Sequence, residues 1–385
     1  MDPIRVGMLG IGQRGLQHLQ ELWRMQDDGR IKICALCDAW SDNLDTTKIR
    51  SFVAEYRDDS VRKYTSFETM LSEASLDALY VCLPPAVHNH EVIAAAQAGI
   101  HVFVEKPMSL YYDEARDMDA AIAASGVIST AGFQLRYSHQ NTVVRDFLTN
   151  KRIVMLSSSS HAALESHSTK HTHTEEVGGP SNRVWTANFS WSGSAVVEAG
   201  IHTVDLMRYW AGDIDWVQAT YVPRDPSDIE NDGDNPYACV VNLGFESGAV
   251  GTLHFSKLRR VFRGIGDQLI LWDHGQLAFE QDGPAAYYYD GPYPPTEAPV
   301  PETLRHPLLS GEDFTTPAGI NETFIEAIEK GDQRLLKSPF RQSMNSLAAV
   351  LAANASHEIG GQRINLKAFA EDEAYRLHRT KPSSP

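Results

Sequence analysis

"IRVGMLGIGQRG", residues 4–15, decides how the first half of the chain folds. The apolar run 4–9 is typical of a buried strand, and three glycines spaced G-x-G-x-x-G follow it where a helix begins. Glycines in such a turn let the pyrophosphate of a dinucleotide approach the free N–H groups at the helix start. We therefore expect a phosphate-binding turn formed by Gly10, Ile11, Gly12, Gln13, Arg14 and Gly15.

The next strand-like run, "IKICALCD" (residues 31–38), ends in an acid. Asp38 follows Gly15 by 23 residues, where a carboxylate can bind both ribose hydroxyls and would repel a 2′-phosphate. The sequence therefore favours NAD over NADP. Cys34 and Cys37 form a C-x-x-C, but residues three apart in a strand point to opposite faces, so we predict core roles and no metal.

Strand-like and helix-like runs alternate through residues 1–133, and three of the helix-like runs end before a glycine, at Gly29, Gly99 and Gly126. This alternation predicts a parallel, doubly wound sheet, and hence a dinucleotide-binding domain. Residues 134–375 contain longer β-branched runs and predict an α+β domain with an open antiparallel sheet, followed by a tail at 376–385 whose last residues, 380–385, should be frayed. Two helix-like runs near residues 320–330 and 343–359 complete this domain or pack back on the first.

Two loops follow strands of the predicted parallel sheet, "CLPPAVHNHE" (82–91) and "VEKP" (104–107). Ligands of such sheets bind outside the carboxyl ends of the strands, so both loops should flank one crevice. We expect cofactor contacts there from Leu83, Pro84, His88, Glu105 and Lys106. For His88, a helix cap or a packed ring is the alternative.

Lys106 lies where the nicotinamide is expected. Oxidation of a secondary alcohol needs a group that accepts the hydroxyl proton and stabilises the developing alkoxide, and a lysine can do both. The alternative is a surface ion pair with Glu105, which would contribute at most about 1 kcal/mol.

The segment "SAVVEAGIHTVDLMRYW" (194–210) predicts a helix with Glu198, His202 and Asp205 on one face. A carboxylate one turn from an imidazole can orient it and raise its pKa, which would make a proton relay near neutral pH. The alternative is an ordinary exposed pair that stabilises the helix.

The polar segment 167–175 contains His167, His171 and His173. Nothing in the sequence supplies a further ligand at a fixed position, so we expect a lid that contacts substrate rather than a metal site. The full set of expected substrate contacts is Lys106, Tyr137, His173, Arg183, Trp185, Glu198 and His202.

Composition limits the classes of partner. The 385 residues are 42% hydrophobic and carry a formal charge of −16, which argues against nucleic acid and anionic membrane surfaces. No apolar stretch is long enough to span a membrane, four cysteines are too few for a disulfide framework, and we expect a cytoplasmic protein that binds small molecules.

The chain resembles the Gfo/Idh/MocA family through "GMLGIGQRG", "CLPPAVHNHEVIAAAQAGIHVFVEKPMSL", "GFQLRYSH" and "VVEAGIHTVDLMRYWAGD". The resemblance implies a Rossmann domain and a second domain whose open, mostly antiparallel sheet forms homo-oligomer contacts, in a dimer or tetramer. It also implies that Lys106 is the catalytic lysine, that His202 transfers a proton and that the Lys106–Pro107 peptide is cis. Glu198 stands where family members commonly have aspartate.

Two enzymatic functions fit these residues. The first is an NAD-dependent oxidoreductase that oxidises a hydroxyl of a sugar, sugar acid or cyclitol. The second is a redox-neutral glycosidase, in which bound NAD oxidises the sugar only transiently, and which would use Lys106, His202 and a base such as Tyr137 or a lid histidine. A regulatory protein without chemistry is a third possibility, against which the presence of both Lys106 and His202 argues.

Overall fold

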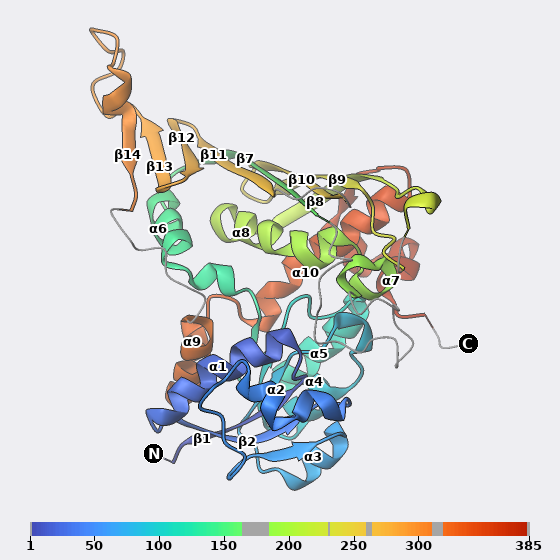
Figure 1. Cartoon of the computed structure of the whole chain (residues 1–385). Coiled ribbons are helices and arrows are strands. Elements are labelled where there is room, and N and C mark those ends of the chain that lie inside the picture. Colours follow the sequence, from blue (N-terminus) through green and yellow to red (C-terminus); the bar gives the residue numbers. More distant parts are fainter. Residues whose placement is uncertain (1, 164–184, 230–231, 259–263, 310–318, 383–385) are drawn as a thin grey trace.

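The computed structural model describes residues 2–163, 185–229, 232–258, 264–309 and 319–382, and shows two β-sheets with helices between them (Figure 1). The strands of the first sheet are β1 (Ile4–Leu9), β2 (Ile31–Cys37), β3 (Arg62–Tyr64), β4 (Ala78–Val81), β5 (His101–Val104) and β6 (Ser129–Ala131). Its helices are α1 (Gln13–Asp27), α2 (Thr46–Arg50), α3 (Phe67–Glu73), α4 (Glu91–Gln97) and α5 (Tyr112–Ser125).

The first sheet is wholly parallel, with the strand order β3-β2-β1-β4-β5-β6. This order confirms the predicted doubly wound fold and places the crevice between the carboxyl ends of β1 and β4, where the chain direction of the crossovers reverses. Gly29, Gly99 and Gly126 all have left-handed backbone conformations, as the helix-cap pattern predicts. The hydrophobic periodicity of the sequence did not predict the short edge strand β3 or helix α3.

The second sheet has nine strands in the order β14-β13-β12-β11-β7-β10-β9-β8-β15. Its strands are β7 (Ile153–Ala163), β8 (Ile214–Val222), β9 (Ala238–Phe245), β10 (Val250–Leu258), β11 (Ile265–Trp272), β12 (Gly275–Glu280), β13 (Gly283–Tyr288), β14 (Arg305–Pro307) and β15 (Ile364–Asn365). Neighbouring strands are antiparallel except β7 and β10, which are parallel. The expected open, mostly antiparallel sheet is confirmed.

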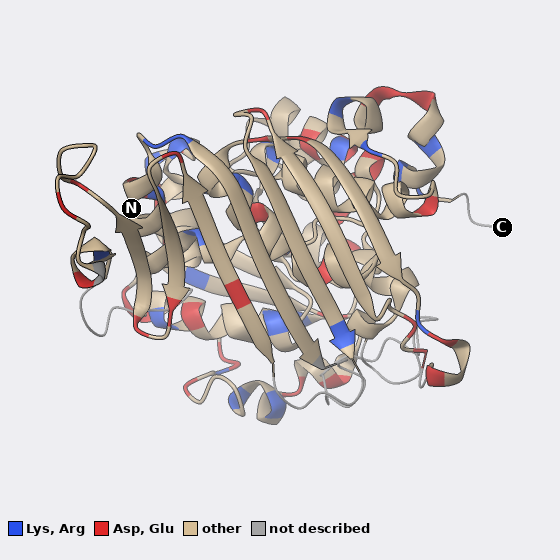
Figure 2. Cartoon of the chain, turned by 90° about the horizontal axis from the view of Figure 1, so that it is seen from above, with Lys and Arg blue, Asp and Glu red and all other residues tan. Residues whose placement is uncertain are grey.

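Helices cover only one face of this second sheet (Figure 1). The helices of this half of the chain are α6 (His139–Leu148), α7 (Phe189–Ser192), α8 (Ile201–Ala211), α9 (Gly319–Lys330), α10 (Phe340–Glu358), α11 (Leu366–Glu371) and α12 (Arg376–Arg379). Figure 2 shows the opposite face, on which the strands lie open and carry few charged side chains. Among the described residues, no helix is long and apolar enough to cross a membrane.

The last helices join the two halves of the molecule. Phe324 of α9 packs edge-on against Tyr80 and Phe103 of the first sheet, with ring centroids 5.6 and 5.8 Å apart. Helix α10 lies under β8 and also contacts α5. The segment expected to be frayed is docked at its start, because Thr380 Oγ1 donates to Asp113 of α5 at 2.6 Å and Lys381 Nζ donates to the carbonyl oxygen of His88 at 2.8 Å.

Candidate active site

A cavity of about 730 Å³ lies outside the carboxyl ends of β1, β2, β4 and β5. Its volume is typical of a site that holds a cofactor and a small substrate. The lining residues that the sequence predicted are Gly10, Gly12, Gln13, Arg14, Asp38, Leu83, Pro84, Glu105, Lys106, Trp185 and Glu198. Most of the predicted site is therefore gathered around one space.

The glycine turn allows the backbone to pass very close to β4. Gly10 has a φ of +89°, and a Cβ there would lie 2.5 Å from the carbonyl oxygen of Cys82. A Cβ on Gly15 would lie 2.0 Å from the carbonyl oxygen of Gly10, so α1 can begin directly behind the turn. No side chain caps the start of α1, which leaves its first N–H groups for an anionic ligand. These features fit a dinucleotide pyrophosphate.

Asp38 links the turn to the end of β2. Its Oδ2 accepts hydrogen bonds from the backbone N–H of Ile11 at 2.7 Å and from Asn43 at 3.1 Å, and its Oδ1 accepts one from the N–H of Trp40 at 2.9 Å. Ile11 itself is buried, so its contribution is the backbone position rather than its side chain. The carboxylate is thus fixed in the cavity wall, as recognition of ribose hydroxyls requires.

Glu105 is a buried anion held by two partners. Arg14 Nε donates to its Oε1 at 2.8 Å, and His18 Nε2 lies 2.7 Å from the same oxygen. Burial alone would raise the pKa of Glu105, but the positive charge of Arg14 and the His18 contact outweigh burial and hold the pKa well below its ordinary value. The Glu105 carboxylate also accepts the backbone N–H of Lys106 at 3.0 Å. Glu105 therefore pairs with Arg14 rather than with the side chain of Lys106.

The side chain of Lys106 points toward the second domain. Its Nζ donates to the backbone carbonyl oxygen of Glu198 at 3.0 Å and lies 3.4 Å from Glu198 Oε1. Glu198 stands in a single π-helical turn (Val196–Gly200) directly before α8, and such turns are frequent at functional sites. The Lys106–Pro107 peptide is cis, as the family resemblance implied.

His202 lies in the first turn of α8, close enough to Lys106 for the ammonium charge to affect it. Burial first, and the charge of Lys106 second, lower the pKa of His202 well below its ordinary value of 6.5. Its Nδ1 is buried and has no hydrogen-bond partner among the described residues. His202 is therefore a neutral imidazole at pH 7. The expectation that Glu198 raises its pKa is wrong, because the carboxylate contacts Lys106 instead.

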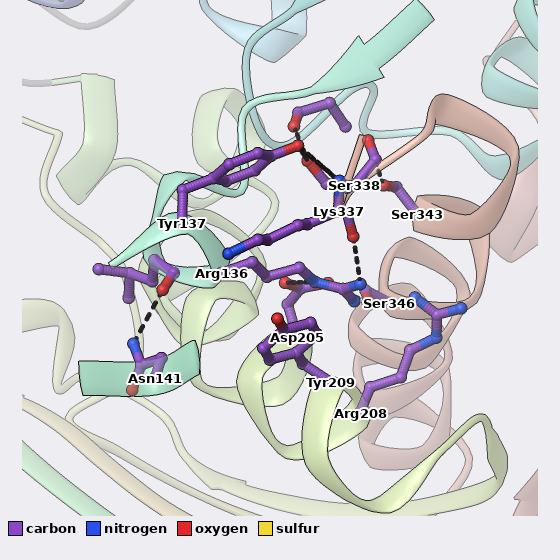
Figure 3. A network of polar contacts seen from close by, with 12 residues as sticks. Arg136, Tyr137, Asn141, Asp205, Arg208, Tyr209, Lys337, Ser338, Ser343 and Ser346 are labelled. Atoms are coloured by element: carbon purple, nitrogen blue, oxygen red, sulfur yellow. Dashed lines mark hydrogen bonds and ion pairs between the residues drawn. The ribbon is translucent and has the colours of Figure 1, made fainter. Parts of the chain in front are cut away.

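Asp205 does not belong to a relay with Glu198 and His202. Its two carboxylate oxygens accept hydrogen bonds from Arg136 Nε and Nη2, each at 2.7 Å, and Ser346 donates to Oδ1 at 2.7 Å (Figure 3). The π-helical turn inserts extra backbone before α8, so regular helical spacing does not carry across it. Asp205 is instead a buried structural partner of Arg136.

Tyr137 and His88 lie outside the cavity lining. The hydroxyl of Tyr137 accepts the backbone N–H groups of Lys337 and Ser338 at 2.9 and 3.2 Å, so this residue anchors that segment (Figure 3). His88 is buried behind the wall, where its Nδ1 contacts Glu91 and its backbone carbonyl oxygen accepts a hydrogen bond from Lys381. His173, Arg183 and the whole segment 167–175 lie outside the described residues.

The cavity also contains aromatic side chains that the sequence reading missed: Trp40, Phe67 and Trp191. Trp40 follows Asp38 by two residues at the end of β2, so the rule that ligands bind at the carboxyl edge would have indicated it. Phe67 begins α3, which was not predicted, and no local signal marks Trp191. Cys37 and Cys82 also line the cavity, and burial raises the pKa of the Cys37 thiol to about 12.

Comparisons with known proteins agree with this architecture. Residues 4–133 match the family described as "Oxidoreductase family, NAD-binding Rossmann fold", and residues 162–266 match the "GFO/IDH/MocA C-terminal domain". Myo-inositol 2-dehydrogenase of Thermotoga maritima is 27% identical over 255 residues, which cover 66% of this chain and 69% of the relative.

Solved structures show the same fold over nearly the whole chain. The WlbA dehydrogenase of Bordetella pertussis, solved with NADH and UDP-GlcNAcA, has a TM-score of 0.72 and 20% identity, and the match covers 95% of this chain and 98% of that one. Levoglucosan dehydrogenase, solved with NADH and L-sorbose, has a TM-score of 0.73 and 17% identity, with 95% and 99% covered. This chain belongs to the Gfo/Idh/MocA family of NAD-binding oxidoreductases.

Proposed function

We propose that this protein oxidises a hydroxyl group of a sugar, sugar acid or cyclitol with NAD. The observation that carries the proposal is a Lys106 ammonium group in the cavity wall whose charge, together with burial, lowers the pKa of His202 on α8. When bound, NAD supplies a nicotinamide ring that can accept hydride. The Gly10–Gly15 turn would hold the pyrophosphate, and Asp38 would hold the ribose hydroxyls.

In this proposal Lys106 and His202 handle the proton of the substrate hydroxyl. The contacts of Lys106 Nζ with Glu198 fix the ammonium group, which can donate a hydrogen bond to the oxygen that becomes an alkoxide. His202 is uncharged and can accept the proton. Glu198 positions Lys106, and Trp185 in the cavity wall offers an apolar surface for a sugar ring.

Related proteins support a polyhydroxylated substrate. One relative is an inositol dehydrogenase, and two structures of the same fold contain UDP-GlcNAcA or L-sorbose. The decisive experiment incubates the purified protein and NAD with a panel of cyclitols, sugars and sugar acids and follows NADH by absorbance.

We expect net NADH formation with at least one member of the panel, and retention of NADH-forming activity in a control that lacks an exposed lysine, Lys32→Met. Chromogenic aryl glycosides are included in the panel. Their cleavage without NADH accumulation would support the redox-neutral glycosidase instead. Tight NAD binding without any turnover would contradict both enzymatic proposals.

The open face of the second sheet is the proposed homo-oligomer contact. Val222, Val240, Val250 and Ile265 project from this face and are 54, 41, 46 and 61% exposed. Thr220, Val240, His254 and Ser159 form one uncharged row across β8, β9, β10 and β7, and the row continues into the carboxylate of Asp267 on β11 (Figure 2). An apolar and small-polar surface of this extent is typical of a protein interface.

Two copies joined through this face should separate when a charge is placed at its centre. We expect Val240→Asp to lower the mass measured by light scattering after gel filtration to that of a smaller assembly. The reason is that the new carboxylate would be desolvated against its symmetry mate. Lys32→Glu, on the first sheet, should keep the wild-type mass. A wild-type protein that is monomeric at micromolar concentration would contradict the proposal.

A further inference from the structure

A second cavity, of about 460 Å³, lies at the ends of α6 and α8 and next to the start of β7. None of its lining residues lines the cavity described above. It is formed by the last turns of both helices, the 149–153 connection and the turn between β9 and β10. The second cavity is therefore a separate space within the α+β half of the chain.

The wall of the second cavity is basic. Its charged residues are Arg136, Arg145, Lys151, Arg152 and Arg208, with Asp213 as the single acid. The whole chain is acidic, with a formal charge of −16. The cluster of cations in this wall is therefore not a consequence of a generally basic surface. Clustered guanidinium groups are the usual recognition elements for phosphate and carboxylate.

Several of these cationic side chains already contact other groups of the protein. Arg136 is neutralised by Asp205, as described above and shown in Figure 3. Arg145 Nη1 donates to the carbonyl oxygen of Tyr209 at 2.7 Å and lies over the Tyr209 ring, so it caps the end of α8. Lys151 Nζ lies 3.9 Å from the centroid of the Phe147 ring.

The guanidinium group of Arg208 is only partly paired. Its side chain is only 8% exposed, and its Nε and Nη2 contact Asp213 Oδ1 at 2.8 and 2.6 Å. Its Nη1, however, is buried without any hydrogen-bond partner among the described residues. Burial first, and the charge of Arg136 second, lower the pKa of Arg208, and the nearby carboxylates of Asp213 and Asp205 do not outweigh them.

A buried guanidinium N–H without an acceptor is costly, because it has lost water and gained nothing in return. Nη1 has no accessible surface of its own, so an anionic ligand in the cavity supplies the missing acceptor once the Arg208 side chain turns toward it. Arg152 stands at the same wall, exposed and without a side-chain partner in the described part of the chain, and can add a second charge contact. The hydroxyl groups of Thr149 and Ser247 complete a wall suited to a polar, charged molecule.

We propose that the second cavity binds a small phosphorylated metabolite, with its phosphate group at Arg208 and Arg152. The space is larger than a phosphate ion requires and is in the range of cavities that hold small metabolites. Binding here is independent of NAD, since the two cavities share no residue. The site does not depend on the proposed hydroxyl oxidation.

The test measures binding of pyrophosphate to the full chain by isothermal titration calorimetry, first without NAD and then saturated with NAD so that the cofactor turn is occupied. We expect wild-type protein to bind, and Arg152→Gln and Arg208→Gln each to weaken binding by about tenfold or more, because each removes a charge-assisted contact. Arg62→Gln, an exposed arginine on β3, serves as the control and should bind like wild type.

Three results would overturn the proposal. They are the absence of binding at millimolar pyrophosphate, unchanged affinity in the Arg152→Gln variant, and binding that disappears once NAD is saturating. The last result would place pyrophosphate in the cofactor cavity. If Arg208→Gln fails to fold, Arg152→Gln decides the question by itself, because the exposed Arg152 side chain supports no described contact.

Discussion

Lys106→Met is expected to reduce kcat for hydroxyl oxidation by about 10²- to 10⁴-fold, the range for losing a positioned acid–base group. Methionine keeps the length and apolar stem of the side chain but removes the ammonium group that contacts Glu198. NAD affinity should change little, because Lys106 Nζ contacts Glu198 rather than the glycine turn or Asp38. Steady-state kinetics and fluorescence titration with NAD measure the two quantities separately.

Lys32→Met is the matched control for this variant, since Lys32 is an exposed lysine on β2 outside the cavity. It should retain wild-type kcat and NAD affinity. Wild-type turnover in Lys106→Met would remove Lys106 from the chemistry. Loss of NAD binding together with activity would instead assign it to the cofactor site.

His202→Asn is expected to lower kcat/KM by about 10²-fold and to change the pH profile, because asparagine cannot accept the proton. In the wild-type enzyme the acid limb of the kcat/KM profile should lie below pH 6.5, since burial and Lys106 lower the pKa of His202. His202 then remains neutral and competent through the range in which a free histidine becomes protonated. Initial rates between pH 4.5 and 9 measure the limb.

The same pKa shift predicts an effect on stability. Below pH 6.5 the unfolded chain protonates His202 while the folded chain does not, so the folded state loses stability as pH falls through this range. His202→Asn should lose less stability between pH 7 and pH 5 than wild type in urea titrations. His274→Asn, which changes an exposed histidine, should behave like wild type in these titrations.

In the kcat/KM profile, an acid limb at pH 7 or above would show that His202 is charged at neutrality.

The cofactor half of the site was largely predictable because its signals are local. Gly10, Gly15 and Asp38 follow strands at fixed spacings, and a parallel sheet gathers the carboxyl ends of its strands at one edge. The same argument placed Lys106 correctly in the cavity wall. These positions follow from one parallel sheet, which the alternation of strand-like and helix-like runs predicts.

The substrate half was less predictable because its partners are distant in sequence. Asp205 pairs with Arg136, 69 positions away, and the Tyr137 hydroxyl serves residues about 200 positions away. Helical spacing suggested a face shared by Glu198, His202 and Asp205, but the residue pattern carries no signal for the π-helical turn before α8. Long-range pairs and local departures from helix geometry were therefore the source of the errors.

Helix α9 packs on the first sheet although it lies late in the sequence. The NAD-binding domain is therefore discontinuous in sequence. A fragment cut after residue 133 would lack Phe324 and Ile320, and would leave the aromatic surface around Tyr80 and Phe103 uncovered. Exposed aromatic surface of this kind promotes aggregation. Chimaeras that exchange substrate domains within this family should therefore transfer α9 together with the cofactor domain.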